Sequence, residues 1–327
     1  MAEGVERIWE IARGFQPSRV LLSAVELGVF EALGDGEQTS AEVASKIGAD
    51  ARATDRLMDA LVALGLLTKE GQQFANSPDT REFLVTGKPG YAGGALGHTI
   101  NLWQTWSTLT DAVRAGTSVV ERRAEDRPDQ AKSFMAAMHL FASRGAPQIL
   151  AEIDLTSVKR VLDIGGGSGA YSIAFCAAKR DLESVVFDLP DIVPITCEYA
   201  AQAGFADRIS TVTGDFNVDE LPTGFDLVYM SQILHSNSRE QNAELINKAW
   251  RSVNPSGQVV IQEFVVDEGR VSPPGPVLFA LNMLVGTQAG DTFTENEIRA
   301  WLADADFADI RRVDPATDTT LLMAKKA

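Results

Sequence analysis

Apolar residues recur at helical spacing along the first part of the chain. Three stretches show this spacing and each predicts a helix: residues 17–33, the segment after Thr39 and Ser40, and residues 53–64. Two short runs of strand-forming residues then flank a polar Lys-Glu-Gly turn and predict a hairpin, at 65–68 and 73–75. Three helices followed by a hairpin are typical of a winged-helix domain. We therefore predict a mainly α-helical winged-helix domain over residues 1–93.

Residues 94–150 also follow a mainly helical pattern and are rich in large apolar side chains. Most of these side chains should form a core between two domains. A lid that makes one wall of an apolar pocket is the alternative, because ligand clefts favour domain interfaces. We treat the segment as a helical linker or lid, and we take Phe134 and Met138 as candidate contacts of a small-molecule substrate.

From Lys159 onward, strand-like and helix-like runs alternate. Five apolar runs of strand length lie at 160–164, 183–187, 209–213, 227–230 and 258–262. This alternation predicts an α/β fold with a Rossmann-like, doubly wound parallel sheet. Two further runs, 308–313 and 319–324, are separated by an Asp-Pro step and predict a C-terminal antiparallel strand pair. The second domain should span residues 151–327.

A glycine-rich turn follows the first of these strands. Residues 161–169 read VLDIGGGSG, and a helix is predicted directly after them. Glycines allow positive φ and let a ligand approach the backbone closely. The free N–H groups at the start of the helix can also receive a carboxylate. Gly165 and Gly167 are therefore candidate cofactor contacts.

Acidic residues end the next two strands. Asp188 lies about twenty residues beyond the glycines, as expected for a carboxylate that bonds both hydroxyls of a ribose. Leu189 follows it and belongs to the same candidate site. After the third strand, Asp215 can accept from an adenine amino group while the ring of Phe216 packs on the base. Either acid could instead only cap its strand, but behind a glycine turn the combination favours an adenosine-bearing cofactor.

The glycine turn leaves two cofactors open. Gly165, Gly167 and Ala170 also fit the dinucleotide fingerprint, so an NAD-dependent dehydrogenase is an alternative. Asp163, just before the glycines, favours S-adenosylmethionine, because a carboxylate suits the cationic amino end of that molecule and does nothing obvious for a pyrophosphate. We include Asp163 among the candidate cofactor contacts.

A candidate general base lies at the end of the fourth strand. His235 lies four residues after Ser231, at the edge where parallel sheets bind ligands. Glu263 ends the next strand. Because neighbouring parallel strands bring such ends together, we expect Glu263 to hold the imidazole in its basic tautomer. A structural role is the alternative, since a His at a strand end can simply bond nearby backbone.

The charge balance limits the choice of partners. A net charge of −16 repels polyanions. The bases around the last winged-helix helix are offset by neighbouring acids: Arg52, Arg56 and Lys69 against Asp50, Asp55, Asp59 and Glu70. We therefore expect no nucleic-acid partner, although a winged-helix transcriptional regulator is a further alternative.

Other features indicate a cytoplasmic protein that neither spans a membrane nor binds a metal ion. The start of the sequence lacks a basic region followed by an apolar core, and the apolar run 277–285 is too short to span a bilayer. Cys176 and Cys197 lack metal-ligand spacing, so we expect two buried thiols. No carboxylate cluster suggests a metal ion.

Together these motifs resemble a known family. Residues 161–324 are similar to the class I S-adenosylmethionine-dependent methyltransferases. With the N-terminal helices, nearly the whole chain resembles the small-molecule O-methyltransferases that include the caffeate and hydroxyindole enzymes. The resemblance implies cofactor contacts by Gly165, Gly167, Asp188, Asp215 and Phe216, and it adds Ser231. It also implies a homodimer joined through the N-terminal helices.

The resemblance extends to the chemistry. His235 and Glu263, in ILHSNS and VVIQEF, match the catalytic histidine and a supporting glutamate of the family. Asn282 and Met283 match a segment that lines the acceptor pocket, where a flexible thioether suits a flat ring. The implied reaction is methyl transfer from S-adenosylmethionine to a hydroxyl of a small aromatic acceptor.

The chain departs from the family pattern at two places. The family's His-Asp-Trp is replaced by His235, Ser236 and Asn237, and its second supporting glutamate by Thr292 with Asp291 beside it. A one-residue shift directs the Asp291 side chain elsewhere. Carbon methylation, or cofactor binding without methylation, are therefore alternatives on the same fold.

Overall fold

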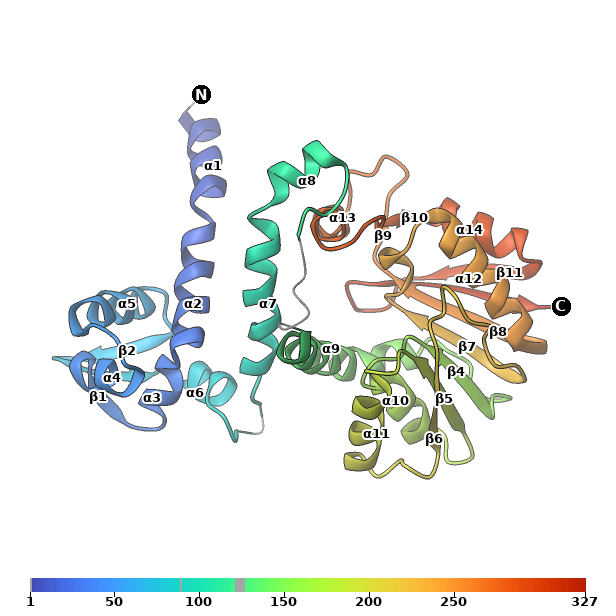
Figure 1. Ribbon diagram of the computed structural model, residues 1–327, viewed down its shortest axis with the longest axis horizontal. Coiled ribbons are helices and arrows are strands. Elements are labelled where there is room, and N and C mark those ends of the chain that lie inside the picture. Colours follow the sequence, from blue (N-terminus) through green and yellow to red (C-terminus); the bar gives the residue numbers. More distant parts are fainter. Residues whose placement is uncertain (1, 89, 121–126) are drawn as a thin grey trace. The chain divides into compact units, whose positions relative to one another are not determined.

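The structure is a computed structural model that describes residues 2–88, 90–120 and 127–327. The chain forms two compact units, Met1–Leu102 and Trp103–Ala327 (Figure 1). Helix α7 (Gly93–Trp106) crosses the boundary between them. The three-part division at residues 93 and 150 stays a prediction about domain roles.

The first unit is mainly helical, as the sequence predicts. Its helices before α7 are α1 (Ala2–Arg13), α2 (Phe15–Leu27), α3 (Val29–Leu33), α4 (Ser40–Ile47), α5 (Ala51–Ala63) and α6 (Pro78–Leu84). A small antiparallel sheet has the order β1–β3–β2 and consists of β1 (Glu37–Thr39), β2 (Leu67–Glu70) and β3 (Gln73–Asn76). β2 and β3 form the expected hairpin. Phe30, Met58 and Phe74 are buried between the helices and this sheet.

The prediction of one continuous helix over residues 17–33 is wrong. α2 ends at Leu27 and α3 begins at Val29, because Gly28 takes the left-handed conformation with φ of 75° and ends the first helix. Helix α1 lies before this segment and was not predicted. The start of α4 is fixed by a capping box, in which the side chains of Thr39 and Glu42 each bond the backbone N–H of the other residue.

The second unit is built on a seven-stranded sheet with the order β11–β12–β8–β7–β4–β5–β6. The parallel strands are β8 (Val253–Glu263), β7 (Phe225–Ser231), β4 (Arg160–Ile164), β5 (Glu183–Asp188) and β6 (Ile209–Thr213). β12 (Thr320–Lys326) pairs antiparallel with β8, and β11 (Phe307–Val313) pairs antiparallel with β12. The doubly wound sheet with a C-terminal antiparallel pair is thereby confirmed.

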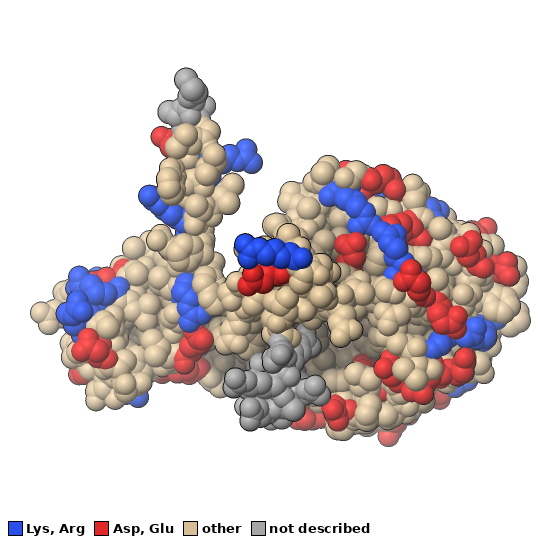
Figure 2. Space-filling view, turned by 45° about the horizontal axis from the view of Figure 1, so that its top comes forward, with Lys and Arg blue, Asp and Glu red and all other residues tan. Residues whose placement is uncertain are grey.

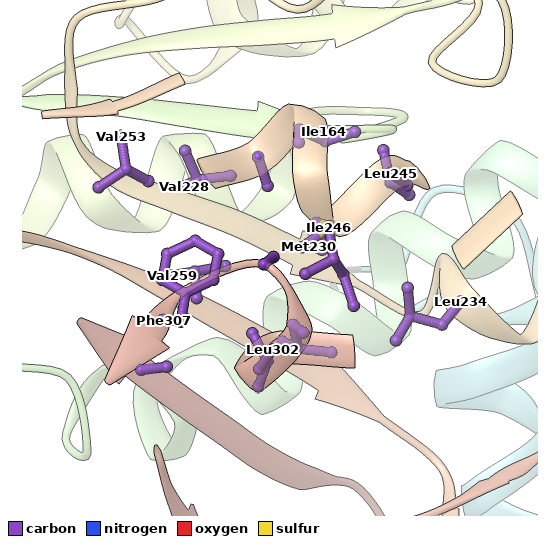
Figure 3. Packing of buried hydrophobic residues seen from close by; sticks show 14 of the residues in the cluster. Ile164, Val228, Met230, Leu234, Leu245, Ile246, Val253, Val259, Leu302 and Phe307 are labelled. Atoms are coloured by element: carbon purple, nitrogen blue, oxygen red, sulfur yellow. The ribbon is translucent and has the colours of Figure 1, made fainter. Parts of the chain in front are cut away.

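Helices cover both faces of this sheet. One face carries α9 (Arg127–Leu150), α10 (Ala170–Ala178) and α11 (Val193–Gln202). The other face carries α12 (Arg239–Ser252) and α14 (Glu295–Asp304), whose Ile246 and Leu302 pack with Val228 and Val259 of the strands (Figure 3). Because both faces are buried, the carboxyl ends of the parallel strands remain as the edge that can receive a ligand.

The remaining elements of the second unit are short or lie at its margin. They are α8 (Leu109–Ala115), the short 3₁₀ helix η2 (Leu234–Ser236), β9 (Val265–Val266), α13 (Pro274–Gly286) and β10 (Phe293–Thr294). β9 pairs with β10 beyond the end of β8. This brings residues 287–294 back toward the end of β7.

Charged side chains of both signs are interspersed on the face shown in Figure 2. In the first unit, Lys69 lies 2.6 Å from Asp59, and Arg56 lies 2.5 Å from Asp55. These ion pairs offset the basic side chains near the hairpin. In the described parts of the chain, no helix combines the length and the apolar character needed to cross a bilayer.

The two cysteines differ in exposure. Cys176 is buried, but Cys197 is exposed, so the prediction of two buried thiols is wrong for Cys197. The reason is the orientation of α11, which buries Thr196 and Ala200 and turns Cys197 toward solvent.

Candidate functional site

The glycine turn joins β4 to α10 in a conformation that has positive φ at three of its glycines. Gly165, Gly167 and Gly169 have φ of 63°, 56° and 72°. A Cβ atom on Gly165 would lie 2.4 Å from Cδ1 of Ile233, which follows β7. The positive φ therefore favours glycine at this position, and a side chain there would also displace the Ile233 side chain. We call residues Gly165–Gly169 the glycine loop.

Side chains from β5 and α11 hold the glycine loop. The Gly167 N–H donates to Asp188 Oδ2 (N···O 2.8 Å), and the Thr196 hydroxyl donates to the Gly167 carbonyl (O···O 2.6 Å). Asp188 Oδ1 accepts from the Leu189 N–H at 2.7 Å. Burial raises the pKa of Asp188, while these two backbone donors oppose the rise. Asp188 thus anchors the loop and keeps lone pairs for a further donor.

Asp163 lies beneath the glycine loop. Its side chain is buried, and Oδ2 accepts from the Ser172 hydroxyl at 2.7 Å. A Cβ atom on Gly166 would lie 2.7 Å from the Asp163 carboxyl group. Burial raises the pKa of Asp163 to about 6. The hydrogen bond from Ser172 lowers this pKa, and repulsion from Asp188 raises it further. The carboxyl group therefore supports the loop from below.

The residues after β6 lie against the same loop. Phe216 Cε1 is 3.5 Å from the position that a Cβ atom on Gly165 would take. Asp215 is half-buried, and its Oδ1 accepts from the Asn217 N–H at 2.8 Å. Leu189 is 46% exposed. The Phe216 ring thus lies against the glycine loop, and Asp215 and Leu189 follow the carboxyl ends of β6 and β5.

Ser231 belongs to a polar network at the end of β7. Its hydroxyl donates to Gln262 Oε1 (O···O 3.1 Å), as does the hydroxyl of the fully buried Tyr229. Gln262 Nε2 donates in turn to Thr319 Oγ1 at 2.8 Å. The network fixes the Ser231 hydroxyl at the end of β7. Gln262 and Thr319 were missed by the sequence analysis, because their contact requires β8 and β12 to pair.

His235 and Glu263 lie in direct contact. His235 Nδ1 is 2.8 Å from Glu263 Oε1, and the His235 backbone N–H donates to Glu263 Oε2 at 3.3 Å. Glu263 is fully buried at the end of β8, whereas His235 is 8% exposed. One carboxylate therefore fixes both the ring and the backbone of the histidine, and Nε2 is the ring nitrogen that faces away from it.

The segment 287–292 supports His235 from the other side. The Asp291 N–H donates to the His235 carbonyl at 3.0 Å, and a Cβ atom on Gly290 would lie 2.4 Å from that oxygen. The Asp291 side chain pairs instead with Arg270 at 3.2 Å. Thr292 is buried. The spacing of these residues in the sequence could not have predicted these contacts.

Aromatic rings lie beside the histidine. The His235 and Phe279 rings meet edge to face, with centroids 4.9 Å apart, and Phe279 lies on α13. Phe264 lies 4.6 Å from Phe279, again between ring centroids. These two tilted rings give the imidazole an apolar, aromatic neighbourhood.

The four candidate acceptor residues lie on two helices. On α13, Asn282 Oδ1 accepts from Trp106 Nε1 at 2.9 Å, and Met283 is buried. On α9, Phe134 is 39% exposed and Met138 is half-buried. Among the side chains that the structure describes, no group of His, Cys, Asp and Glu could hold a metal ion.

Two family models match the chain. Residues 106–308 match the O-methyltransferase domain, and residues 9–86 match the O-methyltransferase dimerisation domain. The first match covers the glycine loop, His235 and Glu263. The second covers most of the mainly helical first unit.

Individual relatives agree with these models. The chain is 34% identical to a 3-hydroxy-5-methyl-1-naphthoate 3-O-methyltransferase of Streptomyces sahachiroi, over 93% of this chain and 90% of that protein. It is 32% identical to the tetracenomycin polyketide synthesis 8-O-methyl transferase TcmO of Streptomyces glaucescens, over 98% and 96% of the two chains. The crystal structure of human N-acetylserotonin methyltransferase in complex with SAM superposes with a TM-score of 0.87 at 27% identity, over 99% and 98%. These matches favour a methyltransferase over the dehydrogenase and the transcriptional regulator.

Asp163 predicts a pH-dependent stability. Its native pKa of about 6 lies above the ordinary value of 3.8, so ionisation opposes folding. The cost is absent below about pH 4 and rises to about 3 kcal/mol at pH 7. Asp163→Asn should therefore gain stability over the wild type as pH rises from 4 to 7. Urea unfolding followed by tryptophan fluorescence measures this difference, and a difference that stays constant with pH contradicts the buried charge.

Proposed function

Because the chain belongs to the O-methyltransferase family, we propose that it methylates a hydroxyl of a small aromatic molecule, with His235 as the general base. S-adenosylmethionine is the methyl donor. The observation that carries the proposal is the buried pair of His235 and Glu263 beside a glycine loop, at one edge of the sheet.

The glycine loop and the strand ends form the proposed cofactor site. The backbone of Gly165 and Gly167 would receive the methionyl end, and Asp188 the ribose hydroxyls. Asp215 and Phe216 would hold the adenine. The proposed contacts are completed by two residues at the same edge, Leu189 and Ser231.

Asp163 would act on the cofactor through its charge and not by direct contact. Its carboxyl group is buried below the loop, with Ser172 as a partner. Negative charge at that place attracts a cationic ligand through the loop without touching it. The sulfonium and ammonium groups of the methyl donor are both positive.

His235 would remove the proton of the acceptor hydroxyl. Glu263 would accept a hydrogen bond from Nδ1–H, which leaves Nε2 as the basic nitrogen. S-adenosylmethionine would supply the methyl group and would become S-adenosylhomocysteine as the carbon–sulfur bond breaks and the carbon–oxygen bond forms. Nε2 of His235 would take the proton of the acceptor hydroxyl in this step, and solvent would later take it from the imidazole.

An aromatic acceptor fits the surroundings of His235. Phe264 and Phe279 would stack on a flat ring, and a phenol with a pKa near 10 loses its proton far more easily than an alkyl alcohol. Asn282, Met283, Phe134 and Met138 are the further proposed acceptor contacts. The naphthoate, tetracenomycin and acetylserotonin relatives support this class of acceptor.

We also propose a homodimer that forms through the first unit. Val5, Ile8 and Ile11 lie on one side of α1 and are 54%, 66% and 73% exposed. An exposed apolar stripe of this kind is typical of a helix that packs against a partner. The match of residues 9–86 to a dimerisation domain supports a second copy of this chain as that partner.

Transfer to oxygen is tested with labelled S-adenosylmethionine and a panel of monocyclic and polycyclic phenols. We expect the labelled methyl group on a phenolic oxygen. Matched acceptors in which hydrogen replaces that hydroxyl should take up no label. NMR of the product locates the methyl group and so distinguishes methylation of oxygen from methylation of carbon. A methyl group on carbon would refute the proposed acceptor atom.

The base is tested by His235→Ala. Loss of a general base should lower kcat about 10²- to 10⁴-fold, whereas the affinity for S-adenosylhomocysteine should stay unchanged, because His235 does not contact the glycine loop's anchors. Ser236→Ala, at the exposed neighbouring position, is the matched control. Unchanged turnover in His235→Ala excludes the role.

The dimer is tested by replacing Ile8 and Ile11 with Asp. Two charges on the apolar side of α1 should convert a dimer to monomers, because a buried, unpaired carboxylate opposes association. Sedimentation equilibrium measures the mass. Glu6→Gln on the same helix should leave it unchanged, and a dimer that survives the double substitution would place the interface elsewhere.

A further inference from the structure

Ser168 gives the glycine loop its one side chain, since residues 165–169 read GGGSG. Ser168 is 4% exposed, and its hydroxyl lies 2.8 Å from Nδ1 of His139 on α9. No other hydrogen bond of the hydroxyl occurs within the described chain. We propose that His139 is a positioning residue, whose bond to Ser168 holds the glycine loop in the conformation that receives S-adenosylmethionine. The inference rests on the proposed cofactor site.

A loop of this composition needs external anchors. Glycine loses more backbone freedom on ordering than any other residue. A loop that is ordered before the ligand arrives spares that cost on binding and so raises affinity. Because four of the five residues have no side chain, the loop can be held by its backbone groups and by Ser168.

The observed anchors come from three elements. Asp188 of β5 holds the Gly167 N–H, and Thr196 of α11 holds the Gly167 carbonyl. Both side chains bond Gly167, so the Ser168 side chain that follows is free to bond a third residue. His139 of α9 holds that next residue, so two consecutive residues are fixed from different directions.

His139 is itself held in place. Its ring stacks on Tyr199 of α11, with centroids 4.0 Å apart and planes inclined by 26°. One turn earlier on α9, Met135 Sδ lies 3.5 Å from the position that a Cβ atom on Gly167 would take. Half-burial lowers the pKa of His139 and so favours the neutral ring, which does not repel a cationic ligand.

Different substitutions separate the hydrogen bond from the stacking. His139→Asn keeps a polar atom near the position of Nδ1 but loses the ring. His139→Phe keeps a ring against Tyr199 but loses the polar atom. If the bond positions the loop, His139→Phe should raise the Kd for S-adenosylhomocysteine about fivefold, as expected for one hydrogen bond between neutral groups. His139→Asn should stay near the wild type.

A double-mutant cycle with Ser168→Ala gives the decisive measurement. His139→Phe should have no further effect on Kd in a chain that already carries Ser168→Ala, because the bond is then absent. Calorimetric titration of the full chain gives all four Kd values, and Ser143→Ala, an exposed position on α9, is the control. A merely structural role would lower thermal stability without this coupling.

The outcomes are distinguishable. The proposal is overturned if His139→Phe changes Kd equally with and without Ser168→Ala, or if it leaves Kd unchanged in the otherwise wild-type chain. The proposal is also overturned if His139→Asn raises the Kd as much as His139→Phe does. The polar atom near the position of Nδ1 would then not be what holds the loop. If the wild-type chain does not bind S-adenosylhomocysteine at all, the proposed cofactor site itself is wrong.

Discussion

Close packing against three glycines is the constraint on which the site depends. A Cβ atom would collide at Gly165 with Ile233, at Gly166 with the Asp163 carboxyl and at Gly290 with the His235 carbonyl, at distances of 2.4 to 2.7 Å. The first two contacts press the glycine loop onto the ends of β4 and β7. The third brings the segment after α13 against the candidate base. Because side chains are absent at these points, the cofactor loop and the histidine can share one edge of the sheet.

Buried carboxylates are the second feature of this edge. Asp163, Asp188 and Glu263 are all buried, and each accepts hydrogen bonds from nearby donors. Burial of charge is costly unless partners are present, and the raised pKa of Asp163 shows that its partners compensate only in part. A cationic ligand above the loop would compensate further. In the proposed site, the buried charge of Asp163 would thus lower the stability of the protein and favour a positively charged cofactor.

At one of the two replaced family positions, other groups of the chain hold the histidine. The chain has Thr292 where the family has a second supporting glutamate, yet His235 is held at three points: its ring and N–H by Glu263, and its carbonyl by the Asp291 N–H. Two of these are contacts of the histidine backbone. Orientation of the imidazole thus depends on one carboxylate and on the path of the chain around Gly290.

The sequence by itself determined the alternation of strands and helices in the second unit, the glycine loop and the acids that follow it, because hydrophobic periodicity and turn chemistry are local properties. It also paired His235 with Glu263, since neighbouring parallel strands end together. Tertiary structure alone decided that Asp163 lies under the loop, that Gln262 and Thr319 hold Ser231, and that His139 reaches Ser168. Those contacts depend on strand register and on which side of a helix faces the sheet, and most of them join segments distant in sequence. Periodicity predicts that a helix has a buried side, but packing decides what that side touches.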